Sequence, residues 1–387
     1  MLAIALVVLA AATPHTYPFE ITSNKPFVRA TVDGSEPLWF ILDSGNNGPS
    51  LIANECADRL KIQRGNEEQA NVGAGSGADV RIATVNHPVT FQALGETLTV
   101  ADPRILTLEH VSRIEGRRVD GLLGSDFLGR HVLQLDYAKK TITVHDPNSY
   151  APPAGALVVP ITTDTGWPIA EGTLTPPGRE PIPCRILIDT GVRTAITFYR
   201  PFSERKGLYD MPRSLHDVTT GGGAGGVSRG DVGRLDVLTL GPAKFENVVA
   251  TFSRDTRGLF ATDYPDAILG GEILKRHRVT FDYPHDRMIL EPYGVTAPFE
   301  YDMSGLFLGT DGPDYRKIRI QAVNPGTPSA DAGLQEKDEI VSIDGRRTPK
   351  LSLDEARALL RVPKTRQLEI RRDGKVMTLR LEARRLV

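Results

Sequence analysis

The sequence predicts a mainly β protein, with two duplicated β lobes followed by a smaller α+β domain. Three observations predict this fold class. The 387 residues include 37 glycines and 28 prolines, a composition typical of many turns between short strands. Long helical patterns are scarce before residue 350. A set of short motifs also recurs in the same order at a constant spacing.

The composition and charge of the chain limit its class. At roughly 150 residues per domain, the length predicts two or three domains. Hydrophobic residues make up 40% and charged residues 24% of the chain, as in ordinary globular proteins. The formal net charge of −2 argues against a nucleic-acid-binding surface.

The amino-terminal segment is apolar from Leu2 to Ala12 and then becomes small and polar. It is shorter than the ~20 residues of a membrane-spanning helix, and it resembles the apolar region of a secretory signal peptide. We therefore expect residues 1–12 to be a signal peptide and the mature protein to be exported, periplasmic or secreted. The alternative is an apolar, frayed terminus.

The repeated motifs define the two lobes. The tripeptide Asp43-Ser44-Gly45 has a counterpart 146 positions later in Asp189-Thr190-Gly191, and each aspartate follows one apolar run and precedes another. Four collinear matches indicate two duplicated lobes, at 17–148 and 155–294, joined by the linker "PNSYAPPAGA". The same spacing relates three further pairs: Gly95 with Gly241, Gly124 in "GLLG" with Gly270 in "AILG", and Asp136 in "LQLDYAKKTITV" with Asp282 in "VTFDYPHDRMIL".

A third tripeptide of this kind, Asp164-Thr165-Gly166, has a different context. It is entered through two threonines and followed by Trp167 and Pro168. Aspartate and glycine favour a turn, and proline cannot donate to a strand ladder. We interpret Asp164 as part of a turn between two strands.

The two lobes resemble those of aspartic proteases, in the retropepsin-like branch but with both halves fused in one chain. The resemblance rests on the paired apolar-Asp-[ST]-Gly motifs, each followed by an apolar-apolar-Gly segment, "GLLG" or "AILG". It implies two β-barrel lobes whose aspartate loops meet at the lobe interface. The roles that it implies are a catalytic pair in Asp43 and Asp189, supporting hydroxyls in Ser44 and Thr190, and close backbone approach at Gly45 and Gly191.

Two adjacent carboxylates are chemically suited to this role. They cannot both ionise easily, so the pair should share one proton. The ionised member can take a proton from an attacking water while the protonated member donates to the peptide carbonyl oxygen. Because Asn46 follows the first motif and Val192 the second, we expect a hydrogen bond from Asn46 to make Asp43 the more readily ionised carboxyl.

Two glycine-rich stretches occupy matching positions after the aspartate motifs. Glycine tolerates the backbone angles of a hairpin tip, and a hinged lid would exclude water from the site. We expect these stretches to be flaps, the alternative being mobile surface loops. The flap residues would be Gly75, Ser76 and Gly77 in the first lobe and Gly221, Gly222 and Gly223 in the second.

Other chemistry has weaker support in the sequence. Ser228 stands in a G-x-S-x-G motif, but glycines precede it and a strand-like run follows, whereas a nucleophile elbow needs a strand before and a helix after. The sequence has neither H-E-x-x-H nor a Cys/His cluster, so we expect no metal or other cofactor. Cys56 and Cys184 have no metal-binding spacing, and we interpret them as isolated core thiols, although an oxidising compartment would allow them to pair.

The last segment, residues 302–387, resembles a PDZ domain of the type attached to bacterial proteases. The resemblance rests on "VNPGTPSADAGLQEKDEIVSIDGRRT" (323–348), "SGLFLG" (304–309) and a helix-like run at 352–361. It implies a groove that binds a peptide as an added strand. The alternative is a domain that only packs on the lobes. The peptide-binding loop would consist of Gly305, Leu306, Phe307 and Leu308.

Together these features predict an exported aspartic endopeptidase with a PDZ domain that recruits peptides or regulates access. Its partners would be peptide or protein substrates and a peptide ligand of the PDZ domain. One alternative is a catalytically inactive peptide-binding or adaptor protein on the same fold. Another is a homodimer in which each aspartate loop pairs with its copy. Cleavage specificity and oligomeric state do not follow from the sequence.

Overall fold

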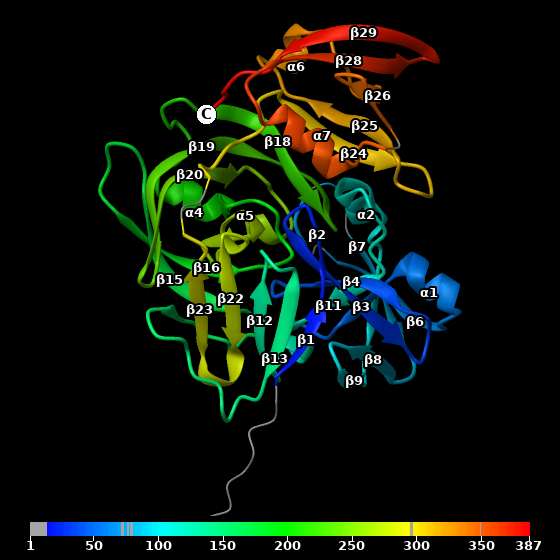
Figure 1. The fold of residues 1–387 in the computed structure, drawn as a ribbon, viewed down its shortest axis with the longest axis vertical. Coiled ribbons are helices and arrows are strands. Elements are labelled where there is room, and N and C mark those ends of the chain that lie inside the picture. Colours follow the sequence, from blue (N-terminus) through cyan, green and yellow to red (C-terminus); the bar gives the residue numbers. More distant parts are fainter. Residues whose placement is uncertain (1–13, 71–72, 76, 78–79, 295–296, 349) are drawn as a thin grey trace, which may run out of the picture.

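The computed structural model describes residues 14–70, 73–75, 77, 80–294, 297–348 and 350–387. Two β lobes lie side by side, and a C-terminal domain sits on them (Figure 1), which confirms the predicted fold class. The expected signal peptide, residues 1–12, lies outside the described residues. Within the described ranges, no helix has the length and apolar character needed to cross a membrane.

The first lobe is built around a sheet with the strand order β6-β7-β10-β5-β11-β4-β3-β8-β9, and β2 pairs with β3. Its elements are β1 (His15–Pro18), β2 (Glu20–Thr22), β3 (Lys25–Val32), β4 (Leu38–Leu42), β5 (Leu51–Ala53), α1 (Asn54–Leu60), β6 (Arg64–Ala70), β7 (Val80–Val85), β8 (Val89–Ala93), β9 (Glu96–Val100), β10 (Arg104–Leu106), α2 (Glu109–Glu115), β11 (Gly121–Leu123), α3 (Ser125–Leu128), β12 (Val132–Asp136) and β13 (Thr141–His145).

The second lobe contains a sheet with the order β15-β16-β21-β17-β20-β19-β18. Its elements are β14 (Leu157–Pro160), β15 (Ile169–Thr175), β16 (Ile182–Ile188), β17 (Ile196–Phe198), α4 (Arg200–Arg205), β18 (Leu215–Gly223), β19 (Gly226–Leu240), β20 (Ala243–Ser253), η1 (Leu259–Ala261), β21 (Ala267–Leu269), α5 (Gly271–Leu274), β22 (His277–Asp282), η2 (Tyr283–His285) and β23 (Arg287–Pro292).

The lobes repeat each other residue by residue at their centres. In the first, β4 runs parallel to β11 with Leu42 opposite Leu123. In the second, β16 runs parallel to β21 with Ile188 opposite Leu269, so both partners are shifted by the same 146 positions. The last residues of β4 and β16 are buried and apolar, as is typical of parallel pairing. Each of these two strands ends directly before one of the aspartates.

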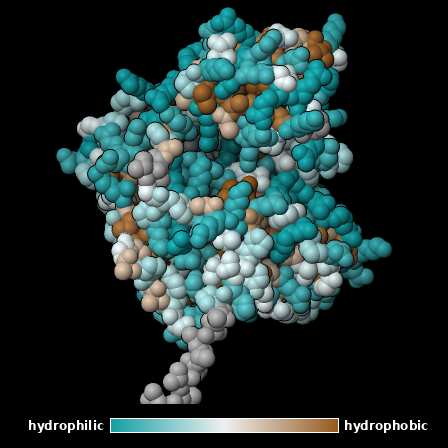
Figure 2. All heavy atoms as spheres, viewed as in Figure 1, coloured by the Kyte–Doolittle hydropathy of each residue, from teal (hydrophilic) through white to brown (hydrophobic). Residues whose placement is uncertain are grey.

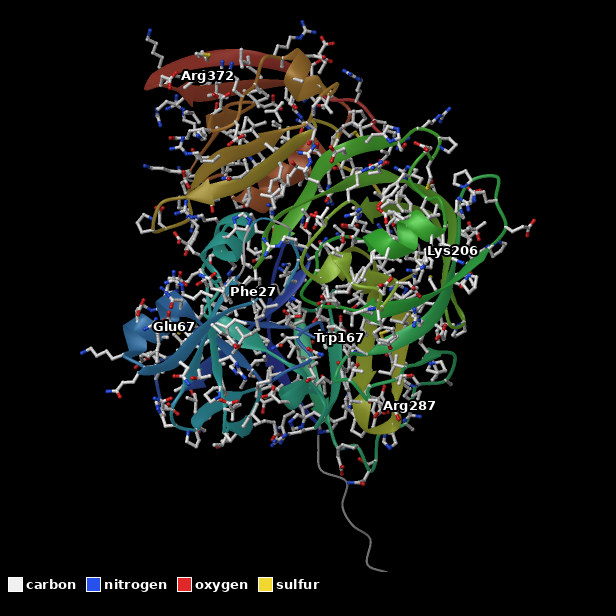
Figure 3. The ribbon with its side chains drawn as sticks, turned by 180° about the vertical axis from the view of Figure 1, so that it is seen from behind. Phe27, Glu67, Trp167, Lys206, Arg287 and Arg372 are labelled. Carbon is white, nitrogen blue, oxygen red and sulfur yellow. The ribbon has the colours of Figure 1, made fainter. Side chains whose placement is uncertain are left out.

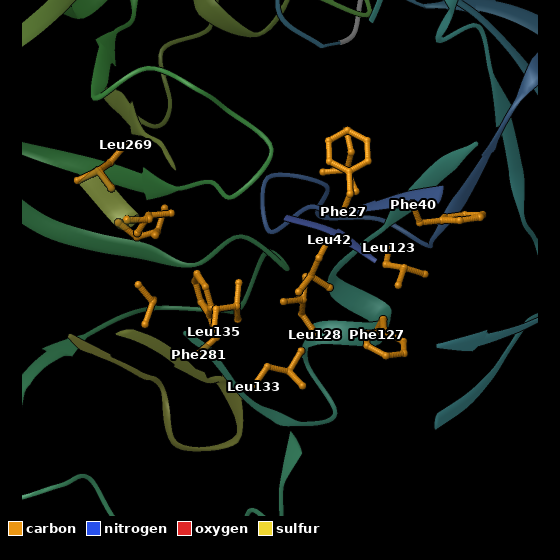
Figure 4. Close-up of a cluster of buried hydrophobic side chains, with 14 of the residues drawn as sticks. Phe27, Phe40, Leu42, Leu123, Phe127, Leu128, Leu133, Leu135, Leu269 and Phe281 are labelled. Carbon is orange, nitrogen blue, oxygen red and sulfur yellow. The ribbon is translucent and has the colours of Figure 1, made fainter. Parts of the chain in front are cut away.

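A third sheet joins the lobes, with the order β1-β13-β12-β22-β23-β14. The repeated segments that predicted hairpins form β12–β13 and β22–β23. At the centre of the sheet Gln134 pairs with Thr280, its own counterpart at a spacing of 146, so the pseudo-two-fold axis passes between these residues. One continuous core spans both lobes, and Figure 4 shows buried side chains that both lobes contribute to it, such as Leu42 and Phe281.

The C-terminal domain has a sheet of order β24-β25-β26-β28-β29, with β27 on β26, and its own hydrophobic core. Its second helix begins with a capping box between Ser352 and Glu355. Its elements are β24 (Leu306–Asp311), β25 (Lys317–Val323), α6 (Pro328–Asp331), β26 (Glu339–Ile343), β27 (Arg346–Arg347), α7 (Leu353–Leu360), β28 (Thr365–Arg372) and β29 (Lys375–Glu382).

The C-terminal domain packs on both lobes. On the first lobe, Arg113 of α2 forms an ion pair with Asp311 at 2.6 Å, and the backbone N–H of Ser23 donates to Asp354 at 2.7 Å. On the second lobe, the backbone N–H of Thr219 in β18 donates to Asn324 at 2.9 Å. The surface is indented where the domain meets the lobes (Figure 2).

Candidate active site

The two predicted aspartates lie together at the interface of the lobes. Each is held at the end of its strand by the glycine-containing segment of its own lobe. The backbone N–H of Asp43 donates to Leu123 O at 2.9 Å, and that of Asp189 donates to Leu269 O at 2.8 Å. The side chains of Asp43 and Asp189 are hydrogen-bonded to each other.

The two neighbouring hydroxyl residues lock the loops together. Ser44 N donates to Thr190 Oγ1 and Thr190 N donates to Ser44 Oγ, both at 3.0 Å. Each hydroxyl then donates across the interface: Ser44 Oγ to Ile188 O at 2.8 Å and Thr190 Oγ1 to Leu42 O at 2.5 Å. Both side chains are completely buried. Because every group has a partner in the opposite loop, the relative position of the aspartates is closely fixed.

The two glycines of the motifs allow the carboxyl groups to approach the opposite loop. A Cβ atom on Gly45 would lie 2.1 Å from Asp189 Oδ2, and one on Gly191 would lie 2.5 Å from Asp43 Cγ. Any larger residue would therefore displace a carboxyl group. The same glycines supply donors, since Gly45 N donates to Asp43 Oδ1 at 3.0 Å and Gly191 N to Asp189 Oδ1 at 2.5 Å.

Burial makes the carboxyl pair retain a proton. Burial and then the charge of Asp43 raise the pKa of Asp189 well above its ordinary value. Burial also raises the pKa of Asp43, but the hydrogen bond from Asp189, the charge of Lys25 and nearby backbone N–H groups oppose this increase. These directions favour Asp43 as the carboxyl that ionises more readily and Asp189 as the one that holds the proton.

The expected reason for this asymmetry is wrong in one respect. The side chain of Asn46 does not reach Asp43: its Nδ2 donates to Pro49 O at 3.1 Å and its Oδ1 accepts from Gly48 N at 3.3 Å. The group of Asn46 that does lower the pKa of Asp43 is its backbone N–H, not its side chain. The loop folds back on itself at this point, so the amide is satisfied locally.

Residues that the motifs did not indicate also support the site. Asp164 lies in an exposed turn, as expected, but Trp167 directly after it donates from Nε1 to Gly45 O at 2.7 Å, and Trp167 lies between the lobes in Figure 3. In the same cavity as the carboxyl pair, Lys25 of β3 and Glu115 of α2 form a buried ion pair at 2.9 Å. The sequence could have indicated Trp167, because it directly follows a third D-T-G motif. It could not have indicated Lys25 and Glu115, which lie 90 positions apart and share no motif.

A cavity of about 960 Å³, here called the central cavity, opens over the carboxyl pair. Both lobes and the C-terminal domain line it, the latter through Phe307 and Arg357. This volume is large enough for several residues of a peptide, since drug-sized ligand pockets span roughly 300–1,000 Å³.

The expected flaps meet over this cavity. Gly221, Gly222 and Gly223 form the end of β18 in the β18–β19 hairpin. The tip of this hairpin contacts the matching stretch of the first lobe, where Gly77 N donates to Gly225 O and Gly225 N donates to Ala74 O, both at 2.9 Å. A Cβ atom on Gly75 would lie 2.3 Å from Gly226 O, so the contact requires glycine. Ser76 lies outside the described residues.

The other candidate chemistry is not assembled in the structure. Ser228 stands inside β19, paired with Gly221, and not at a strand-to-helix turn. Cys56 and Cys184 are buried free thiols. In the part of the chain that the structure describes, no group of three or more His, Cys, Asp or Glu side chains is placed to hold a metal ion.

In the expected peptide-binding loop of the C-terminal domain, most of the backbone N–H groups already have hydrogen-bond partners within the chain. Ser304 N and Gly305 N donate to the carboxylate of Asp302, and Leu306 N donates to Ser304 Oγ. Leu306 and Leu308 belong to the core of the domain, while Phe307 lines the central cavity.

The peptide-binding groove expected beside this loop is also occupied, by Arg357 and by helix α2. Arg357 of α7 donates to Leu308 O at 2.9 Å and to Ile114 O of α2 at 2.6 Å. Thr310 of β24 donates from Oγ1 to Arg113 O at 2.9 Å, so α2 lies along β24. In this arrangement an added peptide strand would have to displace Arg357 and α2.

Two β lobes with paired Asp-[ST]-Gly loops are the architecture of an aspartic protease, and the comparisons with known proteins agree in part. A family model described as aspartyl protease matches residues 28–127, and one described as PDZ domain matches residues 319–372. The chain therefore contains an aspartyl protease-like domain and a PDZ domain.

Two individual proteins are similar to parts of the chain. A "carboxyl-terminal-processing protease" of Synechocystis sp. is 39% identical over 95 residues, which are 24% of this chain and 22% of that protein. This chain thus matches about a fifth of the length of that curated relative. A crystal structure of the HtrA3 PDZ domain bound to a phage-derived ligand is 23% identical, with a TM-score of 0.20, and covers 22% of this chain and 86% of that one.

Replacing Thr190 by valine should destabilise the protein, because Ser44 N–H would lose its acceptor and Leu42 C=O its donor in a buried site. We expect Thr190→Val to lower the free energy of unfolding by about 2 kcal/mol or more in urea denaturation. The control is Thr16→Val, which removes an exposed hydroxyl that bonds to Thr143 at 3.0 Å. Equal losses in the two variants would contradict the proposed locking of the loops.

The raised pKa of Asp189 predicts a pH-dependent stability. Between the unfolded pKa, near 3.8, and the higher folded pKa, the folded protein holds a proton that the unfolded chain releases, so stability falls as pH rises. We expect Asp189→Asn to reduce this decline, to which Asp189 contributes at most about 1.4 kcal/mol per pH unit. Unfolding curves from pH 3 to 7 measure it, with the exposed Asp164→Asn as control. A decline of the same slope in Asp189→Asn and the wild type would contradict the assignment.

Proposed function

We propose that this protein is an aspartic endopeptidase in which Asp43 and Asp189 activate a water molecule to hydrolyse peptide bonds. The observation that carries the proposal is the meeting of the two carboxyl groups beneath a cavity that both lobes line. The aspartyl protease-like domain supports a peptidase. The name of the relative, a protease, agrees with this class.

The proposed reaction uses the unequal ionisation of the pair. Asp43, as the carboxylate, takes a proton from a bound water as the water oxygen attacks the peptide carbonyl carbon. Asp189, as the carboxylic acid, donates its proton to the carbonyl oxygen, so no oxyanion builds up. When the tetrahedral intermediate collapses, the proton held by Asp43 passes to the leaving nitrogen, and a hydroxyl proton of the intermediate returns to Asp189. The buried loops keep both carboxyl groups in place throughout.

The two lobes of one chain are sufficient for this site. The pairing of Gln134 with Thr280 and the exchange of hydrogen bonds between Ser44 and Thr190 both join the halves within a single molecule. These contacts favour an internal pair over one formed between two copies of the chain.

Two further parts of the proposal concern the surroundings of the enzyme. We propose that the protein is exported, on the basis of the signal-like segment 1–12. Amino-terminal sequencing of the protein recovered from outside the cytoplasm tests this, and an intact Met1 would contradict it. We propose that the PDZ domain contributes to peptide binding as a wall of the central cavity, through Phe307.

Cleavage of a mixed peptide library from pH 3 to 8 tests the function. We expect the wild type to cleave as a monomer, and Asp43→Asn and Asp189→Asn each to reduce kcat/KM by about 10³-fold or more, because each removes one half of the acid–base chemistry. Asp164→Asn is the matched control, since it alters the same type of tripeptide in an exposed turn, and should cleave like the wild type.

Two results would contradict the proposal. Cleavage that persists in both substituted dyad variants would exclude the carboxyl pair as the catalyst. A folded wild type that binds peptides but cleaves none at any pH would indicate a peptide-binding protein on a protease fold.

A further inference from the structure

One arginine of the central cavity belongs to the loop that carries Asp189. Arg193 follows Asp189 by four residues and lines the same cavity. Its backbone is fixed on both sides, because Arg193 O accepts from Asn24 Nδ2 at 2.8 Å and Val192 O accepts from Gly271 N at 2.7 Å. Its guanidinium lies 5.9 Å from the ring of Phe307 in the C-terminal domain. The partly buried side chain thus lies between the second lobe and the C-terminal domain.

The neighbouring cations have partners within the protein. Lys25 forms its ion pair with Glu115, Arg357 donates to Ser23 Oγ at 2.8 Å as well as to two carbonyls, and Arg361 lies 3.4 Å from Glu272. By contrast, over the described ranges the guanidinium of Arg193 makes no hydrogen bond and no ion pair within 4.0 Å. Burial lowers its pKa, yet arginine stays protonated in proteins.

A partly buried guanidinium without a partner is costly, and a carboxylate can satisfy two of its N–H groups at once. Glu115 is the carboxylate whose charge most raises the pKa of Arg193. Its Oε1 is bound by Lys25, while its Oε2 is buried without a hydrogen-bond partner among the described residues, so no hydrogen bond joins Glu115 to Arg193. A carboxylate on a bound peptide would complete the coordination that Arg193 lacks.

The lobe repeat shows that the position of Arg193 carries a charge in the second lobe only. The counterpart of Arg193 at a spacing of 146 is Asn47, which is uncharged and donates from Nδ2 to Thr165 O at 3.2 Å. Because the lobes are related by a pseudo-two-fold axis through the carboxyl pair, Asn47 and Arg193 flank the pair on opposite sides. A peptide lying across both would meet a positive charge at one of its ends.

We propose that Arg193 binds a carboxylate group of the substrate, so that the enzyme selects peptides with an acidic group at one position on one side of the cleaved bond. The acidic group is an Asp or Glu side chain or a C-terminal carboxylate. This inference rests on the proposed peptidase function and names its substrate class.

Paired peptides test the selection. Each pair differs by Glu against Gln at one position on either side of the cleaved bond, and a second set compares a free C-terminus with an amide. We expect kcat/KM to be about 10-fold or more higher for the acidic member at a single position. In Arg193→Asn the ratio should fall to about 1, Arg193→Lys should keep part of it, and added salt should reduce it.

The matched control is Arg104→Asn. Arg104 lines the same cavity but is paired with Glu68 at 3.3 Å and Asp102 at 3.6 Å, so its replacement should leave the Glu-to-Gln ratio as in the wild type. A wild type that cleaves acidic and neutral members equally overturns the inference while the peptidase function stands. An undiminished preference in Arg193→Asn, together with lowered thermal stability, overturns it in favour of Arg193 as a counter-ion of Glu115.

A binding measurement separates the inference from catalysis. Fluorescein-labelled Glu and Gln peptides are titrated against full-length Asp189→Asn and against Asp189→Asn/Arg193→Asn, with anisotropy as the readout. The single variant should bind the Glu peptide about 10-fold more tightly, and the double variant should bind both peptides alike. Equal affinities in the single variant overturn the carboxylate site. Absence of cleavage by the wild type, with the binding preference intact, would contradict only the peptidase function.

Discussion

The exchange of hydrogen bonds between Ser44 and Thr190 is the interaction on which the rest of the site depends. Each residue gives its hydroxyl proton to a carbonyl of the opposite strand end and accepts a backbone N–H from the opposite loop. Since both side chains are buried, water cannot replace any of these partners. The network therefore sets the distance between the carboxyl groups, and with it their shared proton and the unequal pKa shifts of Asp43 and Asp189.

The C-terminal domain shapes the cavity above this pair. Through Arg357 it binds carbonyls of its own β24 and of α2, and through Phe307 it reaches the cavity wall. The groove expected to receive a peptide is thus closed by a helix of the first lobe. The domain and the lobes enclose one space together, which is why Arg193 lies between them.

Sequence patterns predicted the fold and the centre of the candidate site because each motif occurs once in each of the two duplicated lobes. The spacing of 146 identified Asp43 and Asp189 and the hairpins of the shared sheet, since each feature had a partner that chance would not supply. The contacts of Trp167, Lys25 and Arg357 could not be predicted in this way. The partners of Trp167 and Arg357 include groups in the other lobe or domain, and that of Lys25 lies 90 positions away in its own lobe, at separations that only the folded chain defines. The expected hydrogen bond from the Asn46 side chain to Asp43 is absent for a similar reason, because the local path of the loop determines where this amide points.

Because the two halves form one polypeptide, the two walls of the cavity can evolve independently. In an assembly of identical copies, a substitution on one wall appears on the other wall as well, and dilution can separate the halves. Here one polypeptide links the halves covalently, and the strand pairing of Gln134 with Thr280 joins them in a common sheet. Each wall is free to diverge, as the difference between Asn47 and Arg193 illustrates. A peptide bound across the cavity of the fused chain would therefore contact different side chains at its two ends.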